Sequence, residues 1–144
     1  MDPIEPVVSR EIYGMPVFVT LTVADLDRTV DWYVNGLGFI SLFTMPGPDG
    51  GPALVHLRRW RYQDILVRPG KPPVGGEWTI SVMAVVEELD ALAARARAHG
   101  GGLVEGPADT PWNTRDVRAT DPDGYVVVSP PGARWTSRTN ASPR

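Results

Sequence analysis

The side chains that most often bind metals or move protons in catalysis are scarce in this chain of 144 residues. It has two histidines, His56 and His99, and no cysteine, which excludes disulfides, thiolate metal sites and a cysteine nucleophile. His56 lies in an expected strand, where it could contact a ligand, act as a general base or be an ordinary half-buried strand residue. No carboxylate that would orient its ring is evident beside it. His99 falls in the last turn of an expected helix, where a positive charge suits the helix dipole.

Three further residues could contact a ligand. Trp112 could form a flat stacking wall for a planar molecule, or pack against the edge of a sheet. Trp60 lies in the sequence Arg58-Arg-Trp-Arg-Tyr62, which is typical either of a cation–aromatic lip over a cavity or of a solvated hairpin tip. Arg115 could hold a carboxylate or phosphate through two hydrogen bonds, although charges at the start of a strand more often form surface pairs.

Composition and charge favour an ordinary globular domain. Hydrophobic residues make up 42% of the chain and charged residues 22%. The net charge of −3 provides no basic surface for phosphates, so a nucleic-acid partner is not expected. The longest strictly apolar run, Val82–Val86, is too short to cross a membrane, and the N-terminus lacks the basic and apolar regions of a secretory signal. We therefore expect a cytoplasmic protein without a membrane partner.

The first half of the chain predicts a strand, a helix and three further strands. Pro16–Val23 is rich in β-branched and aromatic residues and predicts a strand, and Asp25 can cap the helix that follows. The apolar residues of this helix recur at helical spacing: Leu26, Val30, Tyr33, Val34 and Leu37. The strands expected after it are Phe39–Thr44, Ala53–Arg58 and Gln63–Arg68, of which the last two form a hairpin.

The second half repeats this order after a linker rich in proline and glycine. The expected elements are a strand over Trp78–Val86, a helix over Glu87–His99, and strands over Leu103–Gly106, Thr114–Thr120 and Tyr125–Ser129. The sequence Asp121-Pro-Asp-Gly124 between the last two strands is typical of a tight turn.

These patterns predict an α+β protein built of two βαβββ modules. The expected parts are an N-terminal arm (1–15), a first module (16–68), a linker (69–77), a second module (78–131) and a polar C-terminal tail (132–144). A unit of roughly 50 to 60 residues buries too little surface to be stable alone. The two modules must therefore pack together, or exchange edges between two chains.

Several short motifs occur in an order that points to a known family. They are Val23-Ala-Asp-Leu26, Asp31-Trp-Tyr33, Gly36-Leu-Gly-Phe39, Ala96-Arg-Ala-His-Gly100, Pro111-Trp112, Arg115-Asp116 and Asp121-Pro-Asp-Gly-Tyr125. Over residues 16–131 the chain resembles the vicinal oxygen chelate superfamily, which includes glyoxalase I, bleomycin-resistance proteins and extradiol dioxygenases. The resemblance implies paired, curved mixed sheets that enclose a cavity, and a homodimer with cavities at its interface.

The resemblance also implies where a metal would bind. Enzymes of this superfamily usually hold a divalent metal through His or Glu side chains on the first and last strands of each module. Aligning the motifs puts these positions at Phe18, Leu66, Ser81 and Val128. Three of these side chains have no donor atom, and a neutral Ser hydroxyl is a poor ligand. We therefore expect no bound metal and no cofactor.

The resemblance and the missing donors together favour a metal-free protein that sequesters a planar or aromatic small molecule, such as an antibiotic. The alternative is a metal-independent lyase or isomerase with His56 or Arg115 as acid or base, and a third hypothesis is a metal-dependent enzyme with unusual ligands. An enzyme is the less favoured hypothesis, and no catalytic residue is assigned. The expected ligand-binding residues are Trp112, Phe18, Trp60, His56, Leu66, Ser81, Val128, Phe43 and Arg115.

Overall fold

The structure is a computed structural model of the whole chain. It describes residues 8–11, 18–60, 63–73, 79–81, 84, 86–99, 103–111 and 114–129. Trp112, the expected stacking wall, lies outside the described residues, and so does the segment 130–144 that contains the expected polar tail.

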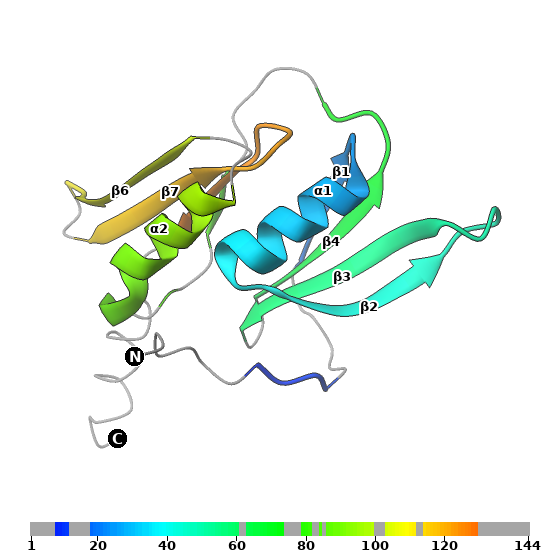
Figure 1. Cartoon of the computed structure of the whole chain (residues 1–144), viewed down its shortest axis with the longest axis horizontal. Coiled ribbons are helices and arrows are strands. Elements are labelled where there is room, and N and C mark those ends of the chain that lie inside the picture. Colours follow the sequence, from blue (N-terminus) through cyan, green and yellow to red (C-terminus); the bar gives the residue numbers. More distant parts are fainter. Residues whose placement is uncertain are drawn as a thin grey trace.

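The first half of the chain forms a four-stranded mixed sheet in the order β1-β4-β3-β2 (Figure 1). Its strands are β1 (Val19–Val23), β2 (Ile40–Pro46), β3 (Pro52–Trp60) and β4 (Gln63–Pro69). β1 runs parallel to β4, and the other neighbouring strands are antiparallel. The predicted hairpin is confirmed as β3 and β4, and both strands are longer than the sequence indicated.

The second half forms another four-stranded sheet, in the order β5-β8-β7-β6. Its strands are β5 (Thr79–Ser81), β6 (Val104–Asp109), β7 (Arg115–Thr120) and β8 (Val126–Ser129). β5 is parallel to β8, while β6–β7 and β7–β8 are antiparallel. The same strand order and directions occur in both halves, which confirms the α+β fold of two βαβββ modules.

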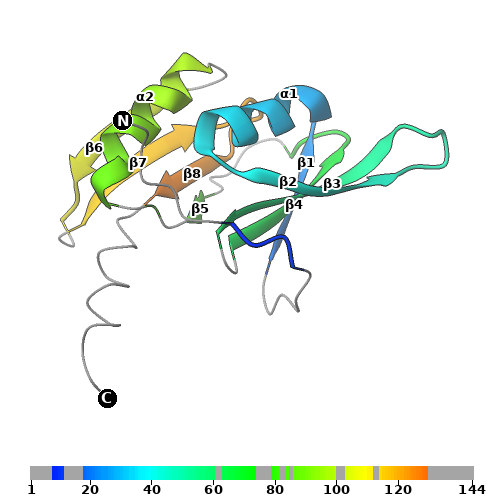
Figure 2. The ribbon, with the colours of Figure 1, turned by 60° about the horizontal axis from the view of Figure 1, so that its bottom comes forward.

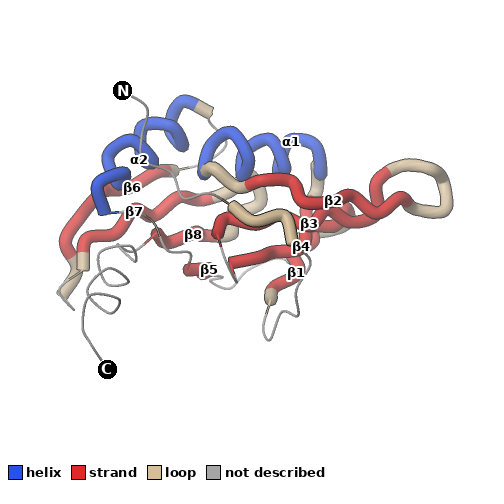
Figure 3. Tube along the Cα trace, turned by 90° about the horizontal axis from the view of Figure 1, so that it is seen from below, coloured by secondary structure: helices blue, strands red, loops and turns tan. Residues whose placement is uncertain are grey.

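Each module places its helix on the same side of the molecule (Figure 3). α1 (Leu26–Asp31) continues into the π-helical turn η1 (Trp32–Gly36), and the 3₁₀ turn η2 (Val86–Glu88) leads into α2 (Leu89–Ala98). α2 packs against η1, so the two helical segments lie side by side. Within the described ranges, no helix is long and apolar enough to cross a membrane.

Local sequence explains how the first helix begins and ends. The Asp25 carboxylate accepts a hydrogen bond from the Arg28 backbone N–H at 3.1 Å, as expected for an N-cap. After the helix, Gly38 takes a φ of 78°, a left-handed conformation that glycine adopts without steric cost. The predicted cap of this helix at Asp25 is therefore confirmed.

The hydrophobic core lies between the helices and the sheet faces that they cover. Side chains alternate across a strand, so every second residue of the central strands points at the helices. The buried residues on these sheet faces are Leu21, Val23, Val55, Leu57, Ile65, Val67, Val117, Ala119 and Val127. From the helical side, Trp32 and Tyr33 are buried and their rings meet edge to face, with 4.9 Å between centroids.

The two modules lie side by side in Figure 2, and polar contacts join them. Tyr33 Oη donates to Asp121 Oδ2 at 2.8 Å, and Tyr125 Oη donates to the Thr22 carbonyl at 3.0 Å. Asp121 also caps its own turn by accepting from the backbone N–H groups of Asp123 and Tyr125. Burial raises the pKa of Asp121 and raises the pKa of Tyr33 well above its usual value. The predicted turn at 121–124 is confirmed, and it also connects the modules.

Three predicted boundaries in the second module are wrong. The described part of the strand expected over Trp78–Val86 is only the three residues of β5, and the α-helix begins at Leu89 instead of Glu87. Glu88 belongs to η2, and its buried side chain forms an ion pair with Arg59. β6 extends to Asp109 because a register shift between Glu105 and Ala108 lets pairing resume beyond Gly106.

Candidate functional site

We call the face of the first sheet that the helices do not cover its open face. Thr20, Leu66, His56 and Phe43 are register neighbours across β1, β4, β3 and β2, and their strand neighbours are turned toward the helices. Phe18 precedes β1 and shares the open face with Thr20 by alternation. The structure thus brings four of the predicted site residues to one surface.

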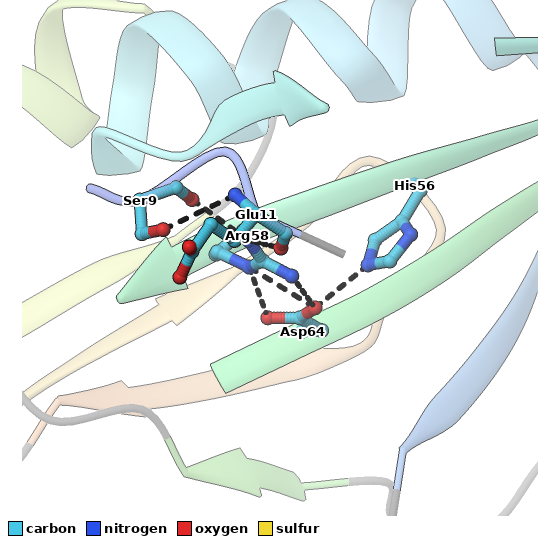
Figure 4. A network of polar contacts seen from close by, with 5 residues as sticks. All are labelled: Ser9, Glu11, His56, Arg58 and Asp64. Carbon is cyan, nitrogen blue, oxygen red and sulfur yellow. Dashed lines mark hydrogen bonds and ion pairs between the residues drawn. The ribbon is translucent and has the colours of Figure 1, made fainter. Parts of the chain in front are cut away.

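A buried polar network lies on this face (Figure 4). Asp64 Oδ2 lies 2.7 Å from His56 Nε2. Arg58 forms a bidentate contact with the same carboxylate, in which Nε donates to Oδ1 at 2.9 Å and Nη2 donates to Oδ2 at 2.9 Å. Its third nitrogen, Nη1, donates to the carbonyls of Ser9 at 2.7 Å and Glu11 at 2.8 Å. One ion pair therefore orients the histidine ring and also holds residues of the N-terminal arm.

The network keeps Asp64 ionised and makes Nε2 of His56 a hydrogen-bond donor. Burial alone would raise the pKa of Asp64, but hydrogen bonds from Arg58 and His56 and the positive charge of Arg58 outweigh it and lower the pKa. An ionised carboxylate can only accept, so His56 donates through Nε2–H. In the neutral ring, Nδ1 carries a lone pair, and no described residue forms a hydrogen bond with it. His56 can accept a hydrogen bond or a proton at Nδ1.

The expectation that no carboxylate orients His56 is wrong. His56 and Arg58 alternate along β3 and so share a face, and Asp64 lies directly opposite Arg58 across the hairpin. The partner is eight residues away in sequence, and only the register of the hairpin brings it close. Combining strand alternation with the predicted hairpin would have identified this pair.

The arginines around Trp60 also differ from expectation. Arg58 is fully buried in the network, and Arg59 points to the opposite face, where it forms a buried ion pair with Glu88 at 3.6 Å. Neither is a solvated charge at a hairpin tip, so that interpretation is wrong for both. Trp60 itself is half-buried, and its contact with a ligand stays a prediction.

Large apolar side chains are exposed on the open face. Phe43 is 49% exposed, Phe18 47% and Met45 44%. Met45 pairs with Leu54, two residues before His56, and so lies on the same face. Leu66 is half-buried between them. Exposed apolar side chains grouped around a buried polar network are typical of a surface that binds a ligand or another protein.

The uncovered face of the second sheet carries the remaining predicted residues that the structure describes. Ser81 is exposed and pairs in register with the buried Val128, whose neighbour on β7 is Arg118. Arg115 is exposed and lies 3.6 Å from the Asp109 carboxylate, which is the surface pair that the sequence allowed. A role for these residues in ligand binding stays a prediction.

Two pockets lie elsewhere on the described surface, and the sequence indicated neither. The larger, of about 460 Å³, follows the seam between β1 and β5 and is lined by residues that include Val19, Thr20, Ile80 and Tyr125. None of the predicted site residues that the structure describes lines it. The smaller, of about 190 Å³, lies on β6 and β7.

Residues 16–128 match the sequence model of the family described as the Glyoxalase/Bleomycin resistance protein/Dioxygenase superfamily, and this range contains both modules. The chain belongs to this superfamily. The resemblance carried by the short motifs is thereby confirmed.

Solved structures of the superfamily share the fold. TioX from Micromonospora sp. ML1 is 27% identical, with a TM-score of 0.64 over 81% of this chain and 98% of its own. A glyoxalase/bleomycin resistance protein from Streptomyces sp. CB03234 is 26% identical, with a TM-score of 0.55 over 78% and 96%. The fosfomycin resistance protein FosX from Listeria monocytogenes, solved with Mn(II) and sulfate, is 17% identical, with a TM-score of 0.63 over 83% and 93%. No curated protein sequence matches the chain significantly.

The residues at the superfamily's metal positions do not suit a metal in this chain. Ser81 and Val128 are register partners on β5 and β8, but the register partner of Leu66 on β1 is Thr20, and Phe18 lies two residues earlier. If Thr20 takes the place of Phe18 among the four metal positions, the set gains only a second neutral hydroxyl, which is a weak metal ligand. Within the described ranges, no group of three or more His, Asp or Glu side chains is placed to hold a metal ion.

Proposed function

We propose that this chain is a small-molecule binding protein that sequesters a planar or aromatic ligand, in the manner of a resistance protein. The observation that carries the proposal is the exposure of Phe18, Phe43 and Met45 on the open face. Covering apolar surface contributes about 25 cal/mol per Å². Aromatic rings add offset or edge-to-face contacts with a planar ligand.

The comparisons support this class of function. The superfamily description names bleomycin resistance proteins, the Streptomyces structure carries that name, and FosX is a fosfomycin resistance protein. The poor donors at the metal positions favour binding without metal chemistry, and the absence of a bound metal stays a prediction.

The proposed contacts divide between the two sheets. On the first sheet, Phe18, Phe43 and Leu66 form an apolar floor, and His56 Nδ1 accepts a hydrogen bond that orients the ligand. The remaining contacts are carried over from the sequence: Trp60, Ser81, Trp112, Arg115 and Val128.

We propose a homodimer in the cytoplasm, with a binding cavity at each subunit interface. The helices cover only one side of both sheets, so the exposed side chains Phe43 and Met45 have no cover within the described part of the chain. A second copy of the chain placed over this face would bury them and turn an open surface into a cavity.

One observation favours a second function, a metal-independent lyase or isomerase. The ionised Asp64 holds His56 in a fixed tautomer with Nδ1 available, which is the arrangement of an oriented general base. In that case His56 would remove a proton from a bound substrate, and Asp64 would stabilise the resulting imidazolium.

A titration of tryptophan fluorescence tests the proposal. The probes are naphthalene, quinoline and anthraquinone derivatives, each recovered afterwards and analysed by mass spectrometry. We expect quenching by at least one probe, weaker binding in Phe43→Ala, and no change in Leu103→Ala, which truncates an apolar side chain that is 62% exposed elsewhere. Failure of all probes to bind would contradict the proposal. A chemically altered probe, whose conversion stops in His56→Ala, would support the enzyme instead.

A further inference from the structure

We infer that the smaller pocket, on the uncovered face of the second sheet, binds a protonated aliphatic amine through Asp116. The pocket lies along β6 and β7, has a volume of about 190 Å³ and is lined in part by Glu105, Asp109, Asp116 and Arg118. The inference rests on the proposed function, since it assigns a second chemical group to the same ligand.

The carboxylate of Asp116 is buried and has no partner among the residues that the structure describes. Asp116 is only 8% exposed, and its Oδ1 is buried without a hydrogen bond from any of them. No described residue donates a hydrogen bond or forms an ion pair with either carboxylate oxygen. A buried polar group without a partner is destabilising, and a charged group is more so. A ligand that supplies a positive charge at the other carboxylate oxygen would offset part of that cost.

The neighbouring arginines do not supply this charge. Arg115, next in sequence, lies 3.6 Å from the Asp109 carboxylate instead. Arg118 follows two residues later on the same face and lines the pocket, but its exposed side chain makes no ion pair with Asp116.

The backbone holds Asp116 in place. Asp116 pairs in register with Ala108, directly after the register shift at Gly106. Gly106 has a φ of 94°, and a Cβ there would come within 2.6 Å of the Asp116 carbonyl oxygen. This close approach of two strands fixes the position of Asp116, so backbone movement does not relieve the burial of its side chain.

The chemistry of the pocket selects an ammonium group. Carboxylates outnumber guanidinium groups among its lining residues, which favours a cation. Since Oδ1 of Asp116 is enclosed, a ligand reaches only the other oxygen, which suits the compact point charge of an ammonium better than the two-point fork of a guanidinium. A metal ion is a poorer fit because, among the described residues, no three His, Asp or Glu side chains are placed to hold one together. The pocket is therefore suited to a ligand that bears a protonated aliphatic amine.

A matched pair of probes tests the inference on the full-length protein. The probes are 2-(2-naphthyl)ethylamine, which is protonated at neutral pH, and 2-(2-naphthyl)ethanol, a neutral molecule of nearly the same shape. We expect the amine to bind about tenfold more tightly than the alcohol, since a charge-assisted hydrogen bond replaces an unpaired buried charge. Asp116→Asn should abolish this preference, and Arg118→Gln should keep or increase it. Asp90→Asn, at an exposed aspartate of α2, is the control and should change nothing.

Chemical shifts of the wild-type protein provide a readout that does not depend on a variant. The amine should perturb the backbone amides of Asp116 and Ala108 in ¹⁵N-resolved spectra more than the alcohol does. Equal binding of amine and alcohol, a preference that survives in Asp116→Asn, or no perturbation at these amides would overturn the inference.

Binding of the alcohol tests the proposed function separately. If amine and alcohol bind equally, the aromatic site stands and the amine site falls. An amine preference without measurable alcohol binding would keep the amine site and count against the aromatic one.

Discussion

The imidazole of His56 and the carboxylate of Asp64 form a 2.7 Å contact between adjacent strands of one hairpin. The Arg58 guanidinium holds the other side of that carboxylate, so a charged group stabilises the orientation of the ring from within the sheet. The same guanidinium reaches the carbonyls of Ser9 and Glu11. A change at Asp64 should therefore affect the stability of the sheet, the position of the arm and the chemistry of the open face.

We expect Asp64→Ala to lower the free energy of unfolding by about 3–5 kcal/mol. The substitution leaves the fully buried Arg58 charge without its carboxylate, and breaking one partner of a buried pair is more costly than removing both. Urea unfolding followed by circular dichroism measures the change. Asp27→Ala, at an exposed aspartate in the first turn of α1, is the control, with an expected loss of less than about 1 kcal/mol. Equal losses in the two variants would show that the network contributes no special stability.

The pH dependence of stability should contain two opposing contributions from buried aspartates. The pKa of Asp64 is lowered from 3.8, so its contribution is complete above that pH and is lost as the pH falls toward the folded-state pKa. The pKa of Asp121 is raised from 3.8 by burial, so its contribution is present below that pH and is lost as the pH rises through the folded-state pKa.

Two variants separate these contributions. Asp64→Asn should reduce the loss of stability that occurs as the pH falls below 3.8. Asp121→Asn should remove the loss of stability that occurs as the pH rises through the folded-state pKa of Asp121. The measurement is the unfolding free energy from about pH 2 to pH 7, a range that covers both titrations. If the loss of stability at low pH is the same in Asp64→Asn as in the wild type, then Asp64 is not its cause.

Trp112→Ala should weaken the binding of a planar aromatic ligand by about tenfold or more, if stacking and burial contribute ~1.5 kcal/mol. Fluorescence titration of Trp112→Ala and Trp60→Ala measures the effect, and both variants should remain folded. A loss in Trp60→Ala alone would move the aromatic wall to the first module. No loss in either would exclude an aromatic clamp.

The purified chain should be a homodimer at micromolar concentration. Light scattering should give twice the chain mass of 15.7 kDa. Phe43→Glu should shift the equilibrium toward the monomer, because it puts a charge on the face that we propose the second copy covers. A wild-type monomer at this concentration would mean that another molecule, or the rest of the same chain, covers that face.

The predictability of the fold and of the site differed for physical reasons. Helical periodicity after Asp25 and strand alternation around His56 are local signals, so the elements and their order followed from the sequence. The partners of His56 and Arg58 depend on the register of a hairpin, and the isolation of Asp116 depends on which neighbouring arginine turns away from it. Long-range register and the direction of long side chains are set by the packed structure. For this reason the strands that carry Phe43, His56 and Leu66 could be predicted, while the charged network around Asp64 and the unpartnered carboxylate of Asp116 could not.

Native mass spectrometry of the protein isolated from its own cells, without chelator, tests the central claim most directly. We predict a dimer that carries one non-covalent organic ligand per chain, less than one equivalent of divalent metal, and a ligand that is released unchanged after incubation. A dimer with one tightly held metal ion per chain, or a ligand converted to a product during incubation, would contradict the account.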